Sequence, residues 1–131
     1  MKSATLSVTI AATPQDVFDY VSDLQNMPLW AVNYCQGVRQ EGDRWIVTTP
    51  FGEIETTVEA NAEYGIVDFH SQAAADVDVL TPTRVVANGE QTEYIFTFFQ
   101  DPGMSNQEFQ AGQKSLQEEL NLLKRLVEEK S

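Results

Sequence analysis

The polar and apolar residues at the start of the chain predict a strand followed by short helices. Residues 5–11 alternate between the two types, which is the period-two pattern of a half-buried strand. Thr13 suits the N-cap of a following helix, and Pro14 suits its first position, where no backbone N–H is needed. Pro28 ends or offsets that helix, so a second short helical turn is expected over residues 27–31.

About six strands are predicted between residues 36 and 100. Apolar runs in this region are separated by turn segments at residues 41–43, 50–52, 63–65 and 88–89. This spacing favours an antiparallel meander. The alternation is least regular between Ser71 and Asp78, where a bulge or a break is expected.

Asn88-Gly89 is the strongest turn signal, because a type I′ hairpin needs positive φ at both central residues. A two-residue loop there predicts that Ala87 faces Glu90 and that Arg84 faces Glu93. This register gives the sheet one charged face and one face that is apolar with several hydroxyls. The apolar, inner face carries Thr56, Phe69, Val79, Thr81, Thr83, Val85, Tyr94, Phe96 and Phe98.

A long amphipathic helix is predicted over residues 106–129. Ser105 and Glu108 have the spacing of a capping box at its start. Apolar residues then repeat at helical spacing at Phe109, Leu116, Leu120, Leu123 and Val127. Several acidic side chains are expected to point away from this stripe, namely those of Glu118, Glu119, Glu128 and Glu129.

Length and charge limit the possible partners. The 131 residues suit one domain, which is expected to span residues 1–131. Acidic residues outnumber basic ones 20 to 8, and the net charge of −12 disfavours binding to nucleic acid and to anionic membranes. No apolar run is long enough for a signal peptide or a membrane helix, and the single Cys35 excludes an internal disulfide. These features predict a cytoplasmic protein.

The N-terminal segment and the closing helix each carry a distinctive set of residues. The segment from Val8 to Asp23 reads as a strand, a Pro-x-x-Val-Phe turn into a helix and an aspartate, with Trp30 soon after. The closing helix carries Leu116, Glu119, Leu120, Leu123 and Lys124. In these features the chain resembles the START/polyketide cyclase superfamily, in particular its polyketide cyclase/dehydrase-like branch, over nearly its whole length.

The resemblance implies a helix-grip fold of the α+β class. In that fold a curved antiparallel sheet of about seven strands wraps around a long C-terminal helix. Two short helices follow the first strand, and a cavity lies between the sheet and the long helix.

An apolar face with aromatic rings and a few hydroxyls is typical of a pocket for a small molecule. The candidate ligand-binding residues are Trp30, Thr56, Phe69, Thr81, Thr83, Tyr94, Phe96, Phe98, Phe109, Gly112 and Leu116. The alternative is a filled core, in which the Tyr94 hydroxyl bonds a backbone group. Gly112 costs about 0.5–1 kcal/mol relative to alanine within a helix. It either leaves room for a ligand or the sheet backbone, or it only allows close packing of helix and sheet.

No catalytic or metal-binding motif stands out in the sequence. His70, the only histidine, is expected on the outer face beside Asp68. The alternative is a bulge that turns it inward, which a role as general base would require. A single histidine also excludes the iron-dependent ring-hydroxylase branch of the superfamily. Seven acidic residues and no basic residue lie between Arg44 and Arg84. Alternating carboxylates can bind a divalent cation, but such a run more often forms a solvated face. We therefore predict no metal and no cofactor.

Three functions remain open. The first is binding or transport of a small hydrophobic ligand, lipid- or polyketide-like, in the cavity. The second is a cyclase, dehydratase or isomerase acting in the same cavity, with Tyr94 or His70 as acid or base. The third is a protein-interaction module similar to the chaperone co-factor branch, and the first strand and long helix would also allow a homodimer. The apolar face without a clear catalytic constellation favours the first.

Overall fold

The computed structural model describes residues 1–74 and 77–130, and within these ranges it has a seven-stranded sheet and a long C-terminal helix. The elements in chain order are β1 (Ser3–Ile10), α1 (Pro14–Val21), the 3-10 turn η1 (Leu24–Asn26), α2 (Met27–Trp30), β2 (Gly37–Glu41), β3 (Arg44–Thr49), β4 (Gly52–Asn61), β5 (Ile66–Ala74), β6 (Val77–Asn88), β7 (Gln91–Phe99) and α3 (Asn106–Lys130). This architecture confirms the predicted α+β helix-grip fold. Of the helices in the described part of the chain, none has the length and apolar composition that a bilayer-spanning segment requires.

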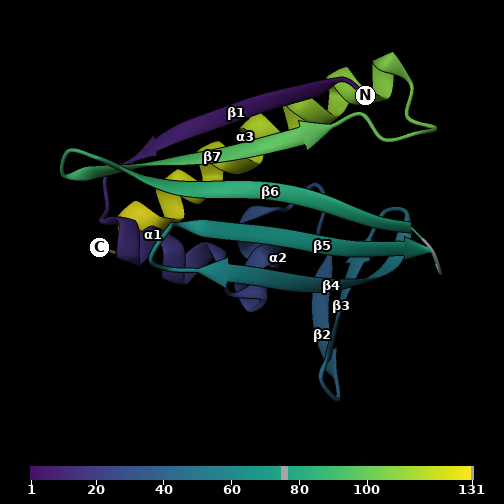
Figure 1. Ribbon diagram of the computed structural model, residues 1–131, viewed down its shortest axis with the longest axis horizontal. Helices are drawn as coiled ribbons and strands as arrows, with labels where there is room; N and C mark the ends of the chain where they lie inside the picture. Colours follow the sequence, from purple (N-terminus) through teal and green to yellow (C-terminus); the bar gives the residue numbers. More distant parts are fainter. Residues whose placement is uncertain (75–76, 131) are drawn as a thin grey trace.

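The strands form one antiparallel sheet in the order β1-β7-β6-β5-β4-β3-β2. Strands β2 to β7 are therefore a meander, and β1 pairs with the last strand. The helix α3 crosses one face of β1, β7 and β6, and α1 and α2 lie on the same side of the sheet (Figure 1). All three helices thus cover the inner face.

Both predicted helix starts are capped by side chains. The Ser105 N–H donates to Glu108 Oε1 at 2.9 Å, and the Glu108 N–H donates to Ser105 Oγ at 3.0 Å. This reciprocal pair confirms the capping box and begins α3 at the expected residue. At α1, Thr13 Oγ1 accepts the N–H of Asp16 at 3.2 Å, and Pro14 follows the cap as predicted.

The predicted β6–β7 turn is wrong by one residue. Asn88 pairs with Gln91, so the two turn residues are Gly89 and Glu90. Gly89 has φ of +62°, and no other residue type in residues 1–74 and 77–130 has positive φ. A lone left-handed glycine at the first central position is the pattern of a type II′ turn, which leaves Asn88 in the strand.

The shifted turn changes every predicted partner in this hairpin but none of the faces. Ala87 faces Thr92 instead of Glu90, and Arg84 faces Ile95 instead of Glu93. The shift moves each partner by two residues, and side chains alternate with a period of two, so every side chain keeps its predicted face. The irregularity expected after Ser71 is also present, as a shift of the β5–β6 register between residues 72 and 74.

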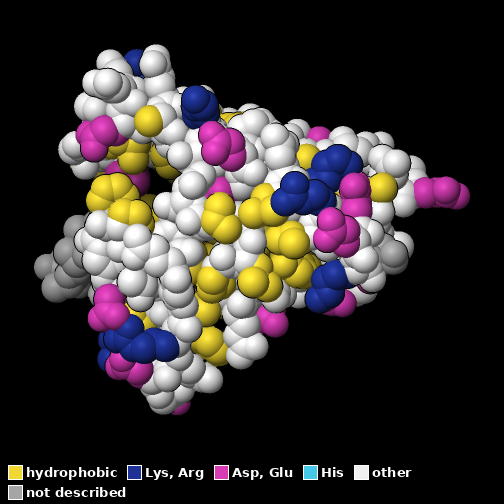
Figure 2. All heavy atoms as spheres, turned by 180° about the vertical axis from the view of Figure 1, so that it is seen from behind, with side chains coloured by type: hydrophobic (Ala, Val, Ile, Leu, Met, Phe, Trp, Pro, Cys, Tyr) yellow, Lys and Arg dark blue, Asp and Glu magenta, His cyan; other side chains and the backbone are white. Residues whose placement is uncertain are grey.

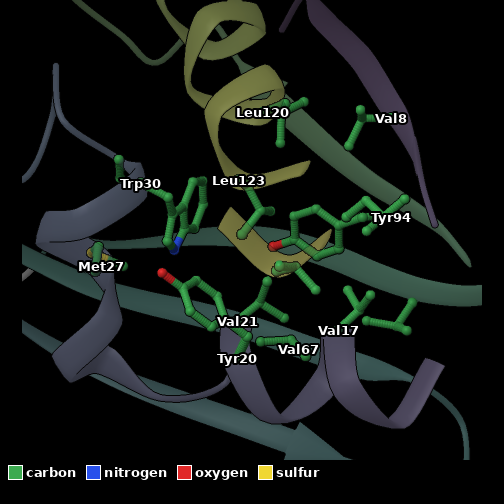
Figure 3. Packing of buried hydrophobic residues seen from close by; sticks show 14 of the residues in the cluster. Val8, Val17, Tyr20, Val21, Met27, Trp30, Val67, Tyr94, Leu120 and Leu123 are labelled. Carbon is green, nitrogen blue, oxygen red and sulfur yellow. The ribbon is translucent and has the colours of Figure 1, made fainter. Parts of the chain in front are cut away.

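The apolar core lies between the sheet and the helices. Figure 3 shows Leu120 and Leu123 of α3 and Val17 of α1 gathered around the ring of Tyr94. Trp30 meets that ring edge to face, with centroids 6.5 Å apart. Full burial of each such side chain stabilises the fold by about 1.5–3 kcal/mol. The core therefore fixes α1, α2 and α3 against the inner face.

Gly65 is the residue at which the β4–β5 connection touches the sheet most closely. Its φ is +67°, and a Cβ atom there would lie 2.1 Å from the Val85 carbonyl oxygen.

We expect Gly65→Ala to destabilise the protein by about 2–4 kcal/mol in urea unfolding, through both backbone strain and overlap. Gly42→Ala is the control, because Gly42 has φ of +63° but open space around it. Its cost should be only about 1 kcal/mol, and equal costs would contradict the role of the close approach.

Candidate functional site

The strand register brings the predicted site residues to the inner face. Thr83 lies opposite Phe96 on the neighbouring strand, and Thr81 lies opposite Phe69. The remaining candidates from outside the sheet lie on the helices that cover this face, at Trp30 on α2 and at Phe109, Gly112 and Leu116 on α3. The sequence therefore predicted correctly which side of the sheet these residues share.

One part of the inner face is a packed core. Trp30, Phe69, Thr83 and Tyr94 are each at most 5% exposed. The Tyr94 hydroxyl points into the interior toward Trp30 and Leu123 (Figure 3). For these residues the filled-core alternative describes the structure.

The backbone partner expected for the Tyr94 hydroxyl is not present. This hydroxyl is buried without a hydrogen-bond partner of good geometry among the described residues. It lies beside the Thr83 hydroxyl, whose proton is donated to the Val67 carbonyl at 2.5 Å. Burial raises the pKa of Tyr94 far above its usual range. At neutral pH the phenol therefore stays protonated, which disfavours a role as general base.

The other part of the inner face is open. Thr81, Phe96 and Phe98 point toward the helices, yet each keeps part of its surface exposed. Figure 2 shows the molecule notched at the end where β5 and β7 finish, with hydrophobic side chains at the notch.

Gly112 is explained by an aromatic ring of the sheet. A Cβ atom at this position would lie 2.7 Å from Cζ of Phe98. The same ring stacks on Phe109, with centroids 5.3 Å apart and planes 16° from parallel. The space left by the missing side chain is therefore filled by close packing of helix and sheet.

A surface pocket borders the inner face at its β3–β4 side. Its volume is about 330 Å³, within the range of small-molecule sites, about 300–1,000 Å³. Its lining mixes apolar with polar and charged residues: Ser22, Asp23, Leu24, Asp43, Arg44, Trp45, Glu55, Thr56, Thr57 and Val58. Thr56 itself is only 3% exposed, so this pocket is a surface hollow beside the inner face.

His70 lies on the outer face, as predicted. Its Nε2 atom is 3.0 Å from Glu59 Oε2, and its Nδ1 atom is 3.6 Å from Asp78 Oδ2. Because the sheet separates it from the inner face, His70 is not an acid or base for a ligand bound there. In the parts of the chain that the structure describes, no group of three or more His, Cys, Asp or Glu residues is arranged to hold a metal ion.

The prediction that Glu119 points away from the apolar stripe is wrong. Its residue surface is only 5% exposed, and its carboxylate faces the connection between α2 and β2. The Oε2 atom accepts the N–H of Asn33 at 3.0 Å and the N–H of Tyr34 at 3.1 Å. The spacing from Leu116 (i+3) and to Leu123 (i+4) was a signal for burial, because both residues lie on the same helix face.

Glu119 belongs to a small polar group at the edge of the apolar face. Burial raises the pKa of its carboxyl to about 7, the two backbone N–H groups lower it, and the charge of Glu118 raises it. The Tyr34 hydroxyl lies within hydrogen-bonding reach of Ser71 on β5. We call Tyr34, Ser71 and Glu119 the polar corner.

Comparison with known proteins identifies the family. The sequence matches, over residues 1–128, the family described as polyketide cyclase / dehydrase and lipid transport. The chain belongs to this family. The finding confirms the resemblance noted from the two ends of the sequence. No protein of curated function matches the chain.

Solved structures share the fold of this polyketide cyclase/dehydrase family member. The protein XoxI from Bacillus cereus is 16% identical, with a TM-score of 0.74 over 97% of this chain and 96% of XoxI. A START superfamily protein from Mycobacterium smegmatis is also 16% identical, with a TM-score of 0.74 and coverage of 98% and 99%. The Zhui aromatase/cyclase from Streptomyces sp. R1128 is 12% identical, with a TM-score of 0.72 and coverage of 97% and 93%. At these identities the likeness shows the shared fold alone.

A double-mutant cycle tests the packing of Gly112. We expect Gly112→Ala to destabilise the unsubstituted protein by about 1 kcal/mol, because overlap with the stacked Phe98 ring outweighs the better helix propensity of alanine. In a Phe98→Ala background the same substitution should stabilise by about 0.5–1 kcal/mol. Urea unfolding of the four proteins measures the coupling. Equal effects in both backgrounds would show that Phe98 does not impose the glycine.

The raised pKa of Glu119 predicts a pH-dependent stability. A carboxyl that ionises near 7 when folded, instead of near 4.5, holds its proton more tightly in the folded state. The folded protein therefore becomes less stable relative to the unfolded chain as the pH rises from 4.5 to about 7. Glu119→Gln removes this loss, so its stability relative to the unsubstituted protein should rise by about 2 kcal/mol from pH 5.5 to pH 8.5 in urea unfolding.

The matched control is Glu129→Gln, an exposed glutamate on the same helix. It makes the same change in net charge but should show no comparable pH dependence. A parallel pH response of the two variants would contradict the perturbed ionisation of Glu119.

Proposed function

We propose that this chain binds a small apolar molecule between the inner face of its sheet and α3. The observation that carries the proposal is the incomplete cover of that face, on which Phe96, Phe98 and Thr81 remain partly exposed. Exposed aromatic rings beside a few hydroxyls suit an apolar ligand that also makes one or two hydrogen bonds. The proposal takes residues 1–131 as one binding domain.

Family membership supports a lipid- or polyketide-like ligand. The family description names both cyclases/dehydrases and lipid transport. Among the proteins with the same fold, Zhui is described as an aromatase/cyclase. Lipids and aromatic rings present apolar surface, which suits the partly exposed aromatic side chains of the inner face.

A cyclase, dehydratase or isomerase in the same site is the second candidate. The observation that favours it is Glu119, a buried carboxyl with a pKa of about 7 beside the inner face. A group that gains and loses a proton near neutral pH is suited to general acid–base catalysis. In such an enzyme Glu119 would take the role that was considered for Tyr94 and His70.

Phe96→Ala tests the binding proposal. We expect the unsubstituted protein to bind N-phenyl-1-naphthylamine, a neutral apolar fluorescent probe, and the variant to bind it about 10-fold more weakly, because an aromatic contact is worth about 1–1.5 kcal/mol. The measurement is a fluorescence titration. Leu80→Ala is the control, since Leu80 is a 43% exposed residue of the outer face, and its affinity should be unchanged. Absence of probe binding to the unsubstituted protein, or equal affinities of all three proteins, would contradict the proposal.

A further inference from the structure

Among the described residues, the carboxylate of Glu119 has no cationic partner. The ion pairs of the arginines there are made with carboxylates on the outer face, as in Arg84 with Asp68 at 2.6 Å. Lys124, on the same helix as Glu119, pairs with Glu128. A buried carboxylate without a counter-charge carries a desolvation cost. In the described part of the chain, the backbone N–H groups of Asn33 and Tyr34 reduce this cost.

The two oxygen atoms of this carboxylate have different roles. Oε2 accepts both backbone hydrogen bonds and so holds the connection between α2 and β2 against α3. Both hydrogen bonds found for this carboxylate among the described residues end on Oε2, and Oε1 is not among the fully enclosed polar atoms that lack a partner there. A carboxylate accepts several hydrogen bonds, so Oε1 is able to bind a donor from outside the chain.

Glu119 lies on the same helix as the residues that pack against the aromatic rings of the sheet. Gly112, against which Phe98 packs, lies seven residues earlier on α3, which is about 10 Å along the helix. Leu116 lies between them on the same side and is buried. The Tyr34–Ser71 pair lies on the sheet side of the carboxylate. The separation along α3 is therefore within the length of one small molecule.

We propose that Glu119 is the polar anchor of the binding site and that the ligand is an apolar or aromatic molecule carrying a protonated amine. The inference rests on the proposed function and adds the chemical class of the ligand. An ammonium group supplies the missing counter-charge and up to three N–H donors for Oε1. A carboxylic acid would place a like charge beside Glu119, and a neutral molecule would leave the carboxylate unpaired. The net charge of −12 also favours the approach of a cation.

The test compares two probes that differ in one group. 2-Naphthylmethylamine is protonated at pH 8, and 2-naphthylmethanol has the same apolar body with a neutral hydroxyl. By isothermal titration calorimetry at pH 8, we expect the unsubstituted protein to bind the amine at least 10-fold more tightly than the alcohol. In Glu119→Gln the ratio should fall to about one. Glu129→Gln, with the same net charge as Glu119→Gln, should retain the full preference.

A pH series on the unsubstituted protein gives a second readout that needs no variant. The amine preference should decline as the pH falls from 8 to 6, because Glu119 then takes up a proton. The other titratable groups that act on Glu119 and its connection are Glu118, Tyr34 and Cys35. Burial raises the pKa values of Tyr34 and Cys35 further above this range, so neither side chain changes charge during the series.

The outcomes separate this inference from the proposed function. Equal affinity of the unsubstituted protein for amine and alcohol would overturn the amine inference alone. Retention of the preference in Glu119→Gln would also overturn it, by assigning the preference to the general negative charge. Failure of both naphthyl compounds to bind would overturn the proposed function and, with it, this inference.

Discussion

The structure depends on covering the apolar face of a seven-stranded sheet with one long helix and two short ones. The long helix, α3, has 25 residues and is about 37 Å long, and it buries a stripe of apolar side chains that includes Leu116, Leu120 and Leu123. The capping box at Ser105 and Glu108 sets where the stripe begins, and the pairing of β1 with β7 sets where the helix lies. The two short helices, α1 and α2, cover another part of the same face. Thr81, Phe96 and Phe98 stay partly exposed on it.

The faces of the strands were predictable because they depend on a period of two and not on exact pairing. The turn at Gly89 shows the difference. A sequence with both Asn88 and Gly89 allows a type I′ turn over Asn88-Gly89 and a type II′ turn over Gly89-Glu90, and local preference does not decide between them. The partners of Ala87 and Arg84 depended on that choice and were wrong, whereas the side-chain faces did not depend on it and were right.

The errors and omissions on α3 have a different cause. The width of the buried face of a helix depends on the number of elements that pack against it. The helix sequence alone does not specify that number. The sheet alone would leave Glu119 at the edge, but the connection after α2 closes over it and adds two N–H donors. Gly112 is a similar case, since its reason is the ring of Phe98 on a strand that only the tertiary structure brings near. The burial of Glu119 and the glycine at position 112 are explained only by partners that are distant in the sequence.

Glu119 links the stability of the protein to the chemistry of its site. Above neutral pH the free protein carries an unpaired, desolvated carboxylate, which lowers its stability relative to a neutral side chain at the same position. A ligand that neutralises this charge would remove its desolvation penalty, and the free energy so gained would be part of the binding free energy. A residue that only braced the connection to α3 would serve better as glutamine, which accepts the same two hydrogen bonds without a charge. Under the proposed binding of an amine, the charge of Glu119 is explained by the cation that its second oxygen would bind.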